Sequence, residues 1–181
     1  MAKEATTKRS AKGSAGKPAS AEEVAGAYFD ALRAQDPDAM AALWDDDGVE
    51  DVVPLGVFRG PEGVRNLFRE LFAAVPDFDF TVQRLLADDR VAVVEWRATG
   101  VFDGGPFNGI DPTGRRVELR GSDWVEVEDG KIVRNTGYYD GAAFARGIGM
   151  LPPEDSAAER AMITGFNALT KLRGTLKEIS R

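Results

Sequence analysis

The spacing of apolar residues changes period once along the chain, and no other sequence feature limits the fold as strongly. Before Pro76 the apolar residues recur every three to four positions, and Val24, Tyr28 and Leu32 form one such stripe, which is typical of an amphipathic helix. After Pro76, from residues 78–83 onward, apolar and polar residues alternate, as they do in half-buried strands. The sequence therefore predicts helices followed by an antiparallel meander, the α+β class.

Local signals mark where these elements begin. Ser20-Ala21-Glu22-Glu23 has the capping-box pattern of a helix start, and Asp36-Pro37 and Gly60-Pro61 open two further helices. We expect a strand at 48–53, and then four strands whose cores are 78–83, 92–98, 117–127 and 132–140.

The 181 residues suit one domain with two extensions. Residues 1–20 are rich in Ala, Gly, Ser and Lys and predict a disordered basic tail. Residues 21–153 form the predicted domain, and residues 154–181 predict an amphipathic helix that packs on its own domain or on a dimer mate. The net charge is −7 in spite of the basic tail. The acidic domain would repel phosphate groups, so we expect no nucleic-acid partner.

Two residue types are missing, and their absence narrows the possible chemistry. The chain contains no cysteine and no histidine, which excludes disulfides, thiolate or imidazole metal ligands and every nucleophile that a histidine activates. We expect no metal and no cofactor, and proton transfer must come from carboxylates, tyrosines, lysines or water. No apolar run is long enough to span a membrane. The apolar core of a signal peptide is also missing from the start, and we expect a cytoplasmic protein.

Asp123 is the first candidate for chemistry, because its neighbours on one strand face are almost all apolar or glycine. An inward-facing carboxyl without a cation has a raised pKa and can donate a hydrogen bond to an oxyanion. In the alternative reading Asp123 caps a bulge or pairs with an arginine such as Arg120, which would lower its pKa. Asp51, where a strand meets the apolar run 52–56, is a candidate general base or a solvated strand end.

Two further residues have two readings each. Asp140, next to Tyr138 and Tyr139, is a candidate acid/base group and also a candidate N-cap of a helix over 141–146, and both readings can be true. Tyr28 lies on the apolar stripe of the first helix, where a buried tyrosine usually packs and finds one hydrogen-bond partner, so its phenol is either functional or structural.

Six sequence stretches together resemble the SnoaL-like polyketide cyclases, within the superfamily that holds nuclear transport factor two and ketosteroid isomerase. They are YFDALRAQDPDAMAALW, FRGPEGVRNLF, the turn at 109–114 with Gly121, the run 128–133, Tyr139-Asp140 and the closing 149–152. The resemblance covers residues 21–153. It implies a cone, a curved and mainly antiparallel sheet wrapped around the N-terminal helices, with an apolar pocket. It also implies a homodimer; the C-terminal helix is an addition.

The resemblance implies roles for the candidate residues. By the ketosteroid isomerase pattern, Tyr28 and Asp123 would bind the oxyanion and Asp51 would move the proton. By the cyclase pattern, Asp140 would be the acid/base group. The histidine that usually accompanies cyclase sites is missing, and the frequent Gln-Leu-Gly near the end is replaced by residues 146–149.

These observations predict a cofactor-free enzyme of the isomerase or cyclase type. Its substrate would be an apolar ketone-, steroid- or polyketide-like small molecule held by Trp96, Phe58, Tyr138 and Phe72. The alternative is a non-catalytic binding or assembly module with the same fold.

Overall fold

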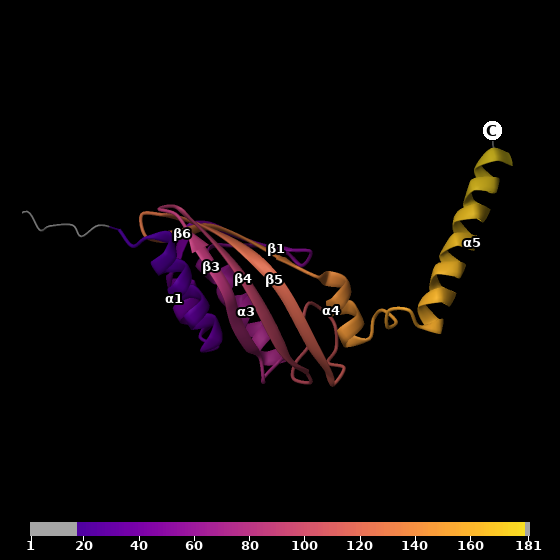
Figure 1. Ribbon diagram of the computed structural model, residues 1–181, viewed down its shortest axis with the longest axis horizontal. Helices are drawn as coiled ribbons and strands as arrows, with labels where there is room; N and C mark the ends of the chain where they lie inside the picture. Colours follow the sequence, from indigo (N-terminus) through magenta and orange to yellow (C-terminus); the bar gives the residue numbers. More distant parts are fainter. Residues whose placement is uncertain (1–17, 180–181) are drawn as a thin grey trace, which may run out of the picture.

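The structure, a computed structural model, describes residues 18–179 (Figure 1). Most of the predicted basic tail, residues 1–17, lies outside the described residues. The domain has the predicted α+β class, with helices ahead of a mainly antiparallel sheet that curves around them to form the cone.

The first two helices begin where the capping signals predict. Helix α1 (Ala21–Arg33) starts with a complete capping box, in which Glu23 N donates to Ser20 Oγ over 3.3 Å and Ser20 N donates to Glu23 Oε2 over 2.9 Å. Helix α2 (Pro37–Ala42) is capped by the carboxylate of Asp36, which accepts from two backbone N–H groups.

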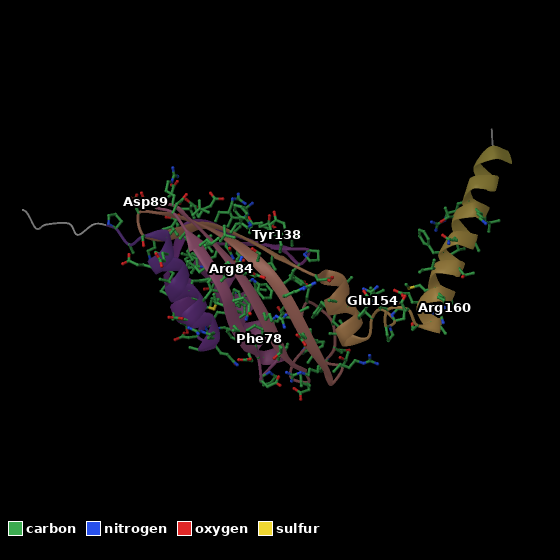
Figure 2. The ribbon with its side chains drawn as sticks, viewed as in Figure 1. Phe78, Arg84, Asp89, Tyr138, Glu154 and Arg160 are labelled. Atoms are coloured by element: carbon green, nitrogen blue, oxygen red, sulfur yellow. The ribbon has the colours of Figure 1, made fainter. Side chains whose placement is uncertain are left out.

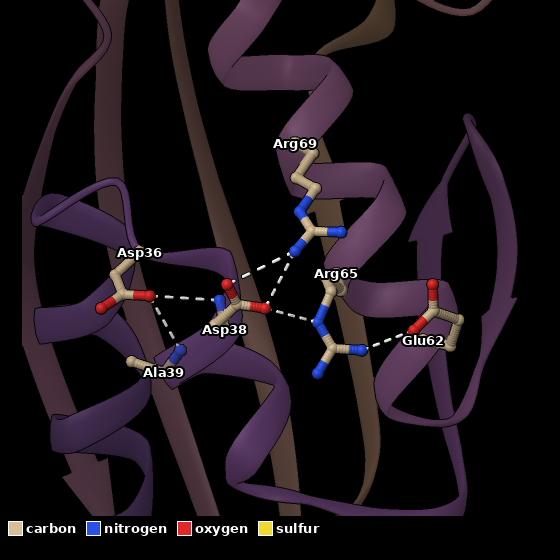
Figure 3. A network of polar contacts seen from close by, with 6 residues as sticks. All are labelled: Asp36, Asp38, Ala39, Glu62, Arg65 and Arg69. Carbon is tan, nitrogen blue, oxygen red and sulfur yellow. Dashed lines mark hydrogen bonds and ion pairs between the residues drawn. The ribbon is translucent and has the colours of Figure 1, made fainter.

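Charged side chains join α2 to helix α3 (Gly60–Ala74) (Figure 3). Asp38 accepts from Arg65 Nε over 2.6 Å and from Arg69 Nη2 over 3.0 Å, and Arg65 also pairs with Glu62. Asp38 and Glu62 are exposed. Exposed pairs stabilise a protein little, so this network orients the two helices more than it holds the fold.

Six strands form one sheet: β1 (Trp44–Val53), β2 (Gly56–Arg59), β3 (Asp79–Ala87), β4 (Val91–Phe102), β5 (Arg115–Glu128) and β6 (Lys131–Tyr139). Their order is β2-β1-β6-β5-β4-β3. Strands β3 to β6 are the predicted antiparallel meander, and β1 joins β6 in parallel. Strand β1 begins four residues before the predicted one, and β2 was not predicted.

The core lies between the helices and the inner face of the sheet. Its first part packs α1 and α3 against β3, β4 and β5, and its second part lies under the end of α3 and under helix α4 (Gly141–Ile148). The largest fully buried side chains are those of Tyr28, Phe29, Met40, Ile132, Ile148, Glu50, Val64, Val94, Val125 and Asn135. Two of these ten are polar, and they mark the site described below.

Helix α5 (Ala157–Ile179) stands away from the domain (Figure 1). Up to residue 173, its large apolar side chains are exposed by 46–67% and comprise Met162, Ile163, Phe166, Leu169 and Leu172. Arg146 of α4 forms two ion pairs in this region. One joins it to Glu159 in the first turn of α5, and the other to Glu154 in the connection between the two helices (Figure 2). The apolar face thus does not pack on its own domain, one of the two predicted outcomes. No described helix is long and apolar enough to cross a membrane.

Candidate active site

A cavity of about 140 Å³ lies between α3 and the inner face of the sheet. Its walls are almost entirely apolar, and the two carboxyl groups among them come from β1 and β5. The lining residues are Glu50, Val52, Leu55, Leu67, Phe68, Leu71, Phe78, Phe80, Trp96, Ala98, Phe107, Leu119, Asp123, Gly137, Tyr139 and Phe144.

Asp123 points inward, as its strand pattern predicts, and is 8% exposed. Its two oxygens accept hydrogen bonds from different side chains: Trp96 Nε1 donates to Oδ1 over 2.8 Å and Asn135 Nδ2 donates to Oδ2 over 2.8 Å. No ion pair between Asp123 and a basic residue is found within residues 18–179. The pairing with Arg120 weighed in the sequence is therefore not formed.

Glu50, which the sequence analysis did not select, is the second carboxyl and is 2% exposed. Tyr28 Oη donates to its Oε2 over 3.0 Å, and Asn135 Nδ2 lies 3.0 Å from its Oε1. Successive side chains of a strand point to opposite faces, and both Glu50 and Val52 line the cavity. Asp51 therefore faces the other way, and its predicted place in the cavity is wrong by one residue.

Asn135 connects the two carboxyl groups and is 0% exposed. One atom, Nδ2, donates to both Glu50 and Asp123. The amide oxygen Oδ1 has no hydrogen-bond partner among the described residues. The contacts of the amide are thus to the two carboxyl groups, and it fixes their separation.

Burial raises the pKa values of the buried acids. For Glu50 the pKa is raised well above 4.5, first by burial and then by the charge of Asp123; the hydrogen bonds from Tyr28 and Asn135 oppose the rise. For Asp123 burial raises the pKa, and the bonds from Asn135 and Trp96 oppose it. The pKa of Tyr28 is also raised, by its burial and by the neighbouring Glu50. The raised pKa predicted for Asp123 is thus confirmed.

The hydrogen bonds distinguish the two carboxyl groups. Both donors to Asp123 are N–H groups, which cannot accept a proton from it, and such bonds favour the charged form. Glu50 instead faces the hydroxyl of Tyr28, which can donate or accept, so a protonated Glu50 keeps its hydrogen bond. Two carboxyl groups that share one hydrogen-bond donor do not both ionise readily, because their negative charges repel each other. The arrangement therefore favours a charged Asp123 beside a neutral Glu50.

Asp140 lies outside the cavity. It is the N-cap of α4, and its Oδ1 accepts from Ala143 N over 2.9 Å, so the capping alternative is confirmed. Its neighbour Tyr138 is 52% exposed and lines a groove on the outer face of the sheet with Arg84 and Asp140 (Figure 2). Tyr139 turns inward and lines the cavity.

The four predicted substrate-binding aromatics lie in four different places, and one of them lines the cavity. Trp96 lines the cavity and holds Asp123. Phe72 packs behind two lining residues, with its ring centre 6.0 Å from Phe68 and 5.7 Å from Phe78. Phe58 packs against the second part of the core, and Tyr138 lies on the outer face. Tyr28 does not line the cavity; it lies behind Glu50 and donates a hydrogen bond to it.

No cluster of acidic side chains suited to a metal ion occurs within residues 18–179. The ionisable groups that the cavity wall presents are two hydrogen-bonded carboxyl groups and the phenol of Tyr139. The sequence profile of the SnoaL-like domain family matches residues 25–135, which include every member of this carboxyl network.

The chain belongs to the SnoaL-like domain family.

Solved structures share this SnoaL-like fold at low sequence identity. A candidate SnoaL-like polyketide cyclase from Jannaschia sp. CCS1 has a TM-score of 0.66 and 21% identity, over 81% of this chain and 100% of the other. TsrD from Streptomyces laurentii has a TM-score of 0.63 and 24% identity, over 72% and 95%.

A third neighbour is a protein with a ketosteroid isomerase-like fold from Catenulispora acidiphila, in complex with trimethylamine. Its TM-score is 0.60 and its identity 16%, over 72% of this chain and 98% of the other. No curated protein sequence matches the chain. At these identities the neighbours show the fold alone, so the function must be argued from the site.

Proposed function

We propose that this SnoaL-like protein is a cofactor-free enzyme that moves a proton on a small apolar carbonyl compound. The observation that supports it is the pair of carboxyl groups, Glu50 and Asp123, joined by Asn135 at the wall of an apolar cavity. Buried acids with different environments are the usual equipment for acid–base catalysis without a metal.

Each acid has one task in the proposed reaction. The carboxylate of Asp123 takes a proton from the carbon next to the carbonyl group. The electron pair of that C–H bond forms the C=C bond of the enolate, and the π pair of the carbonyl group moves to its oxygen. Neutral Glu50 donates a hydrogen bond to this oxygen, where a fixed donor in a dry site stabilises the developing charge. Asp123 then returns the proton to the same carbon or, in an enone, to a carbon further along. Tyr28 supports Glu50 from behind.

The size of the cavity narrows the substrate class. An apolar cavity of about 150 Å³ binds a molecule of the size of benzene, and the present one has about 140 Å³. A molecule with one ring fits this volume, whereas the fused rings of a steroid or of a folded polyketide exceed it. We therefore propose a monocyclic ketone or enone.

The test is exchange of the α-protons of cyclohexanone for deuterium in D₂O, followed by NMR. The expected catalysed rate falls by a factor of about 10²–10⁴ in Asp123→Asn, the usual contribution of an acid–base group. Asp51→Asn is the matched control and should keep the rate. It makes the same change of Asp to Asn on β1, at the residue after Glu50, whose side chain does not line the cavity. Catalysis that survives Asp123→Asn but not Asp51→Asn would restore the roles predicted from the sequence.

A second candidate function is binding without catalysis. It is favoured by the walls, which apart from the carboxyl network consist mainly of Phe and Leu side chains. In that case cyclohexanone binds with saturation, while exchange stays at the uncatalysed rate in the wild type and in both variants.

We also propose the homodimer and the cytoplasmic location that the sequence led us to expect. Support for the dimer comes from the outer face of the sheet, where Leu86, Trp124 and Tyr138 are at least half exposed. Large exposed apolar side chains grouped on one face are typical of interaction surfaces. Sedimentation of the wild type and of Trp124→Glu tests the dimer, which the charge should weaken.

A further inference from the structure

A second, smaller cavity of about 50 Å³ adjoins the first. The two cavities share six wall residues: Leu71, Phe78, Ala98, Phe107, Leu119 and Phe144. Glu50 and Asp123 line only the larger one. The second cavity is therefore the apolar continuation of the site, on the side away from the carboxyl groups.

The remaining walls of the second cavity contain no charged group. They come from the end of α3, from β4 and from β5, and comprise Val75, Thr99, Gly100, Phe102 and Val117. A ligand whose oxygen is held at Glu50 and Asp123 can therefore extend only an apolar part in this direction, since a buried polar group without a partner is unfavourable.

We infer that the second cavity binds a short alkyl tail of the substrate, so that the substrate class is a monocyclic ketone or enone with a small alkyl substituent. This inference rests on the proposed function for the position of the carbonyl oxygen. The side chains between the two cavities include Leu71, Phe78 and Phe144, which are only partly buried. Partly buried side chains change rotamer readily, so the tail can pass between them.

The volume and the floor of the second cavity limit the length of the tail. If six ring carbons need about 150 Å³, then 50 Å³ accommodates about two carbons. The floor is formed where β4 meets α3: a Cβ atom added to Gly100 would lie 2.2 Å from Val75 Cγ1. This close approach closes the cavity where Val75 packs on Gly100, so an ethyl group is the tail that the volume of about 50 Å³ fits best.

The experiment is a ligand-observed NMR titration of the wild type with cyclohexanone and its 4-methyl, 4-ethyl and 4-butyl derivatives. Burial of one methylene group strengthens binding about fourfold. The affinity should therefore rise about fourfold with each carbon as far as the ethyl group, and the butyl compound should gain nothing more. Equal affinities along the series, or a continued rise to butyl, would overturn the inference.

Val75→Phe fills the second cavity without touching the first. It should abolish the gain of 4-ethylcyclohexanone over cyclohexanone and leave the affinity for cyclohexanone itself unchanged. Val117→Leu is the milder second variant, in case Val75→Phe does not fold, and should reduce the gain. Val101→Phe is the matched control, because Val101 lines neither cavity, and it should keep the full gain. A full gain in the two cavity variants contradicts the inference.

The two proposals fail in different ways. If the wild type binds 4-ethylcyclohexanone more tightly than cyclohexanone but does not catalyse exchange of α-protons, the alkyl site stands and the catalytic proposal is wrong. If exchange depends on Asp123 but the ethyl gain is absent, the catalytic proposal stands and the alkyl site is wrong.

Discussion

The carboxyl group of Glu50 is buried, and no basic side chain of residues 18–179 forms an ion pair with it. Its burial makes the stability of the protein depend on pH. Its pKa is raised in the folded state, so over a range above about pH 4.5 the folded protein keeps a proton that the unfolded chain has lost. The free energy of unfolding is therefore highest below that range, falls as the pH rises towards the folded pKa, and levels off above it.

Glu50→Gln should remove this contribution. The variant should lose less stability than the wild type as the pH rises above about 4.5, as measured by urea unfolding at a series of pH values. Glu95→Gln, an exposed position on β4, is the control and should follow the wild type. Parallel curves for Glu50→Gln and the wild type would mean that Glu50 is ionised at no extra cost in the folded protein.

Asn135 is the positioning residue of the pair, and its effect should be visible in the pH profile of the reaction. Its hydrogen bonds lower the pKa values of Glu50 and Asp123. Asn135→Leu should therefore move the rise of the exchange rate to higher pH, because the base Asp123 then ionises later. Asn135→Gln retains an amide and should move it less. A lower rate with an unchanged pH profile would assign Asn135 a packing role only.

The inward side chain of Asp123 could be predicted from the sequence, because its strand alternates regularly. Glu50 could not, for a reason specific to β1. The run Val49-Glu50-Asp51-Val52 offers two adjacent acids, and a shift of one residue exchanges the faces of a strand. The pairing of β1 with β6 shifts register between Trp44 and Val49, so counting from the start of the strand does not settle the face.

At the scale of elements, α4 closes the cavity region through Phe144, which lines both cavities, and Asp140 caps this helix. Asp140→Ala should lower the free energy of unfolding by about 0.5–2 kcal/mol, the usual effect of losing an N-cap. Because Phe144 is then less firmly placed, the KM for exchange should rise more than kcat falls.

Asp140→Ser separates capping from acid–base chemistry, since a serine can cap a helix but cannot act as a carboxylate. It should restore both stability and KM in unfolding and exchange measurements. If Asp140→Ser is stable but loses kcat, the acid/base role that the cyclase resemblance implied for Asp140 is correct.

Most helices and strands could be predicted because caps, turns and apolar periodicity are local features of the sequence. The exceptions depend on pairing between strands, which these local features do not show. The acidic run 45–47 has the composition of a turn, yet it belongs to β1. Packing on β6 explains the difference: the backbone of Gly48 passes so close to this strand that an added Cβ would lie 3.0 Å from the carbonyl oxygen of Ile132. Strand β2 has only four residues, too few for a recognisable alternating pattern, and it is stabilised by its pairing with β1.

At the scale of the whole molecule, α5 shows the limit of amphipathic patterns. Its sequence predicted one apolar face, and the structure contains that face on a helix. A hydrophobic pattern tells which side of a helix avoids water, but not which surface covers that side. In this chain the domain does not cover the apolar side of α5, since five apolar side chains of the helix remain exposed.

Removal of residues 154–181 should therefore leave the domain intact. The loss consists of the exposed helix and the ion pairs of Arg146 with Glu154 and Glu159, and exposed or partly exposed pairs contribute about 0–1 kcal/mol each. The truncated protein should keep its free energy of unfolding to within about 2 kcal/mol and its rate of α-proton exchange, as measured by urea unfolding and NMR. A decrease of several kcal/mol would mean that the apolar face of α5 is covered in solution. Phe166→Gln in the full-length chain distinguishes that case, because it should then reproduce much of the loss, whereas an exposed Phe166 can be replaced at little cost.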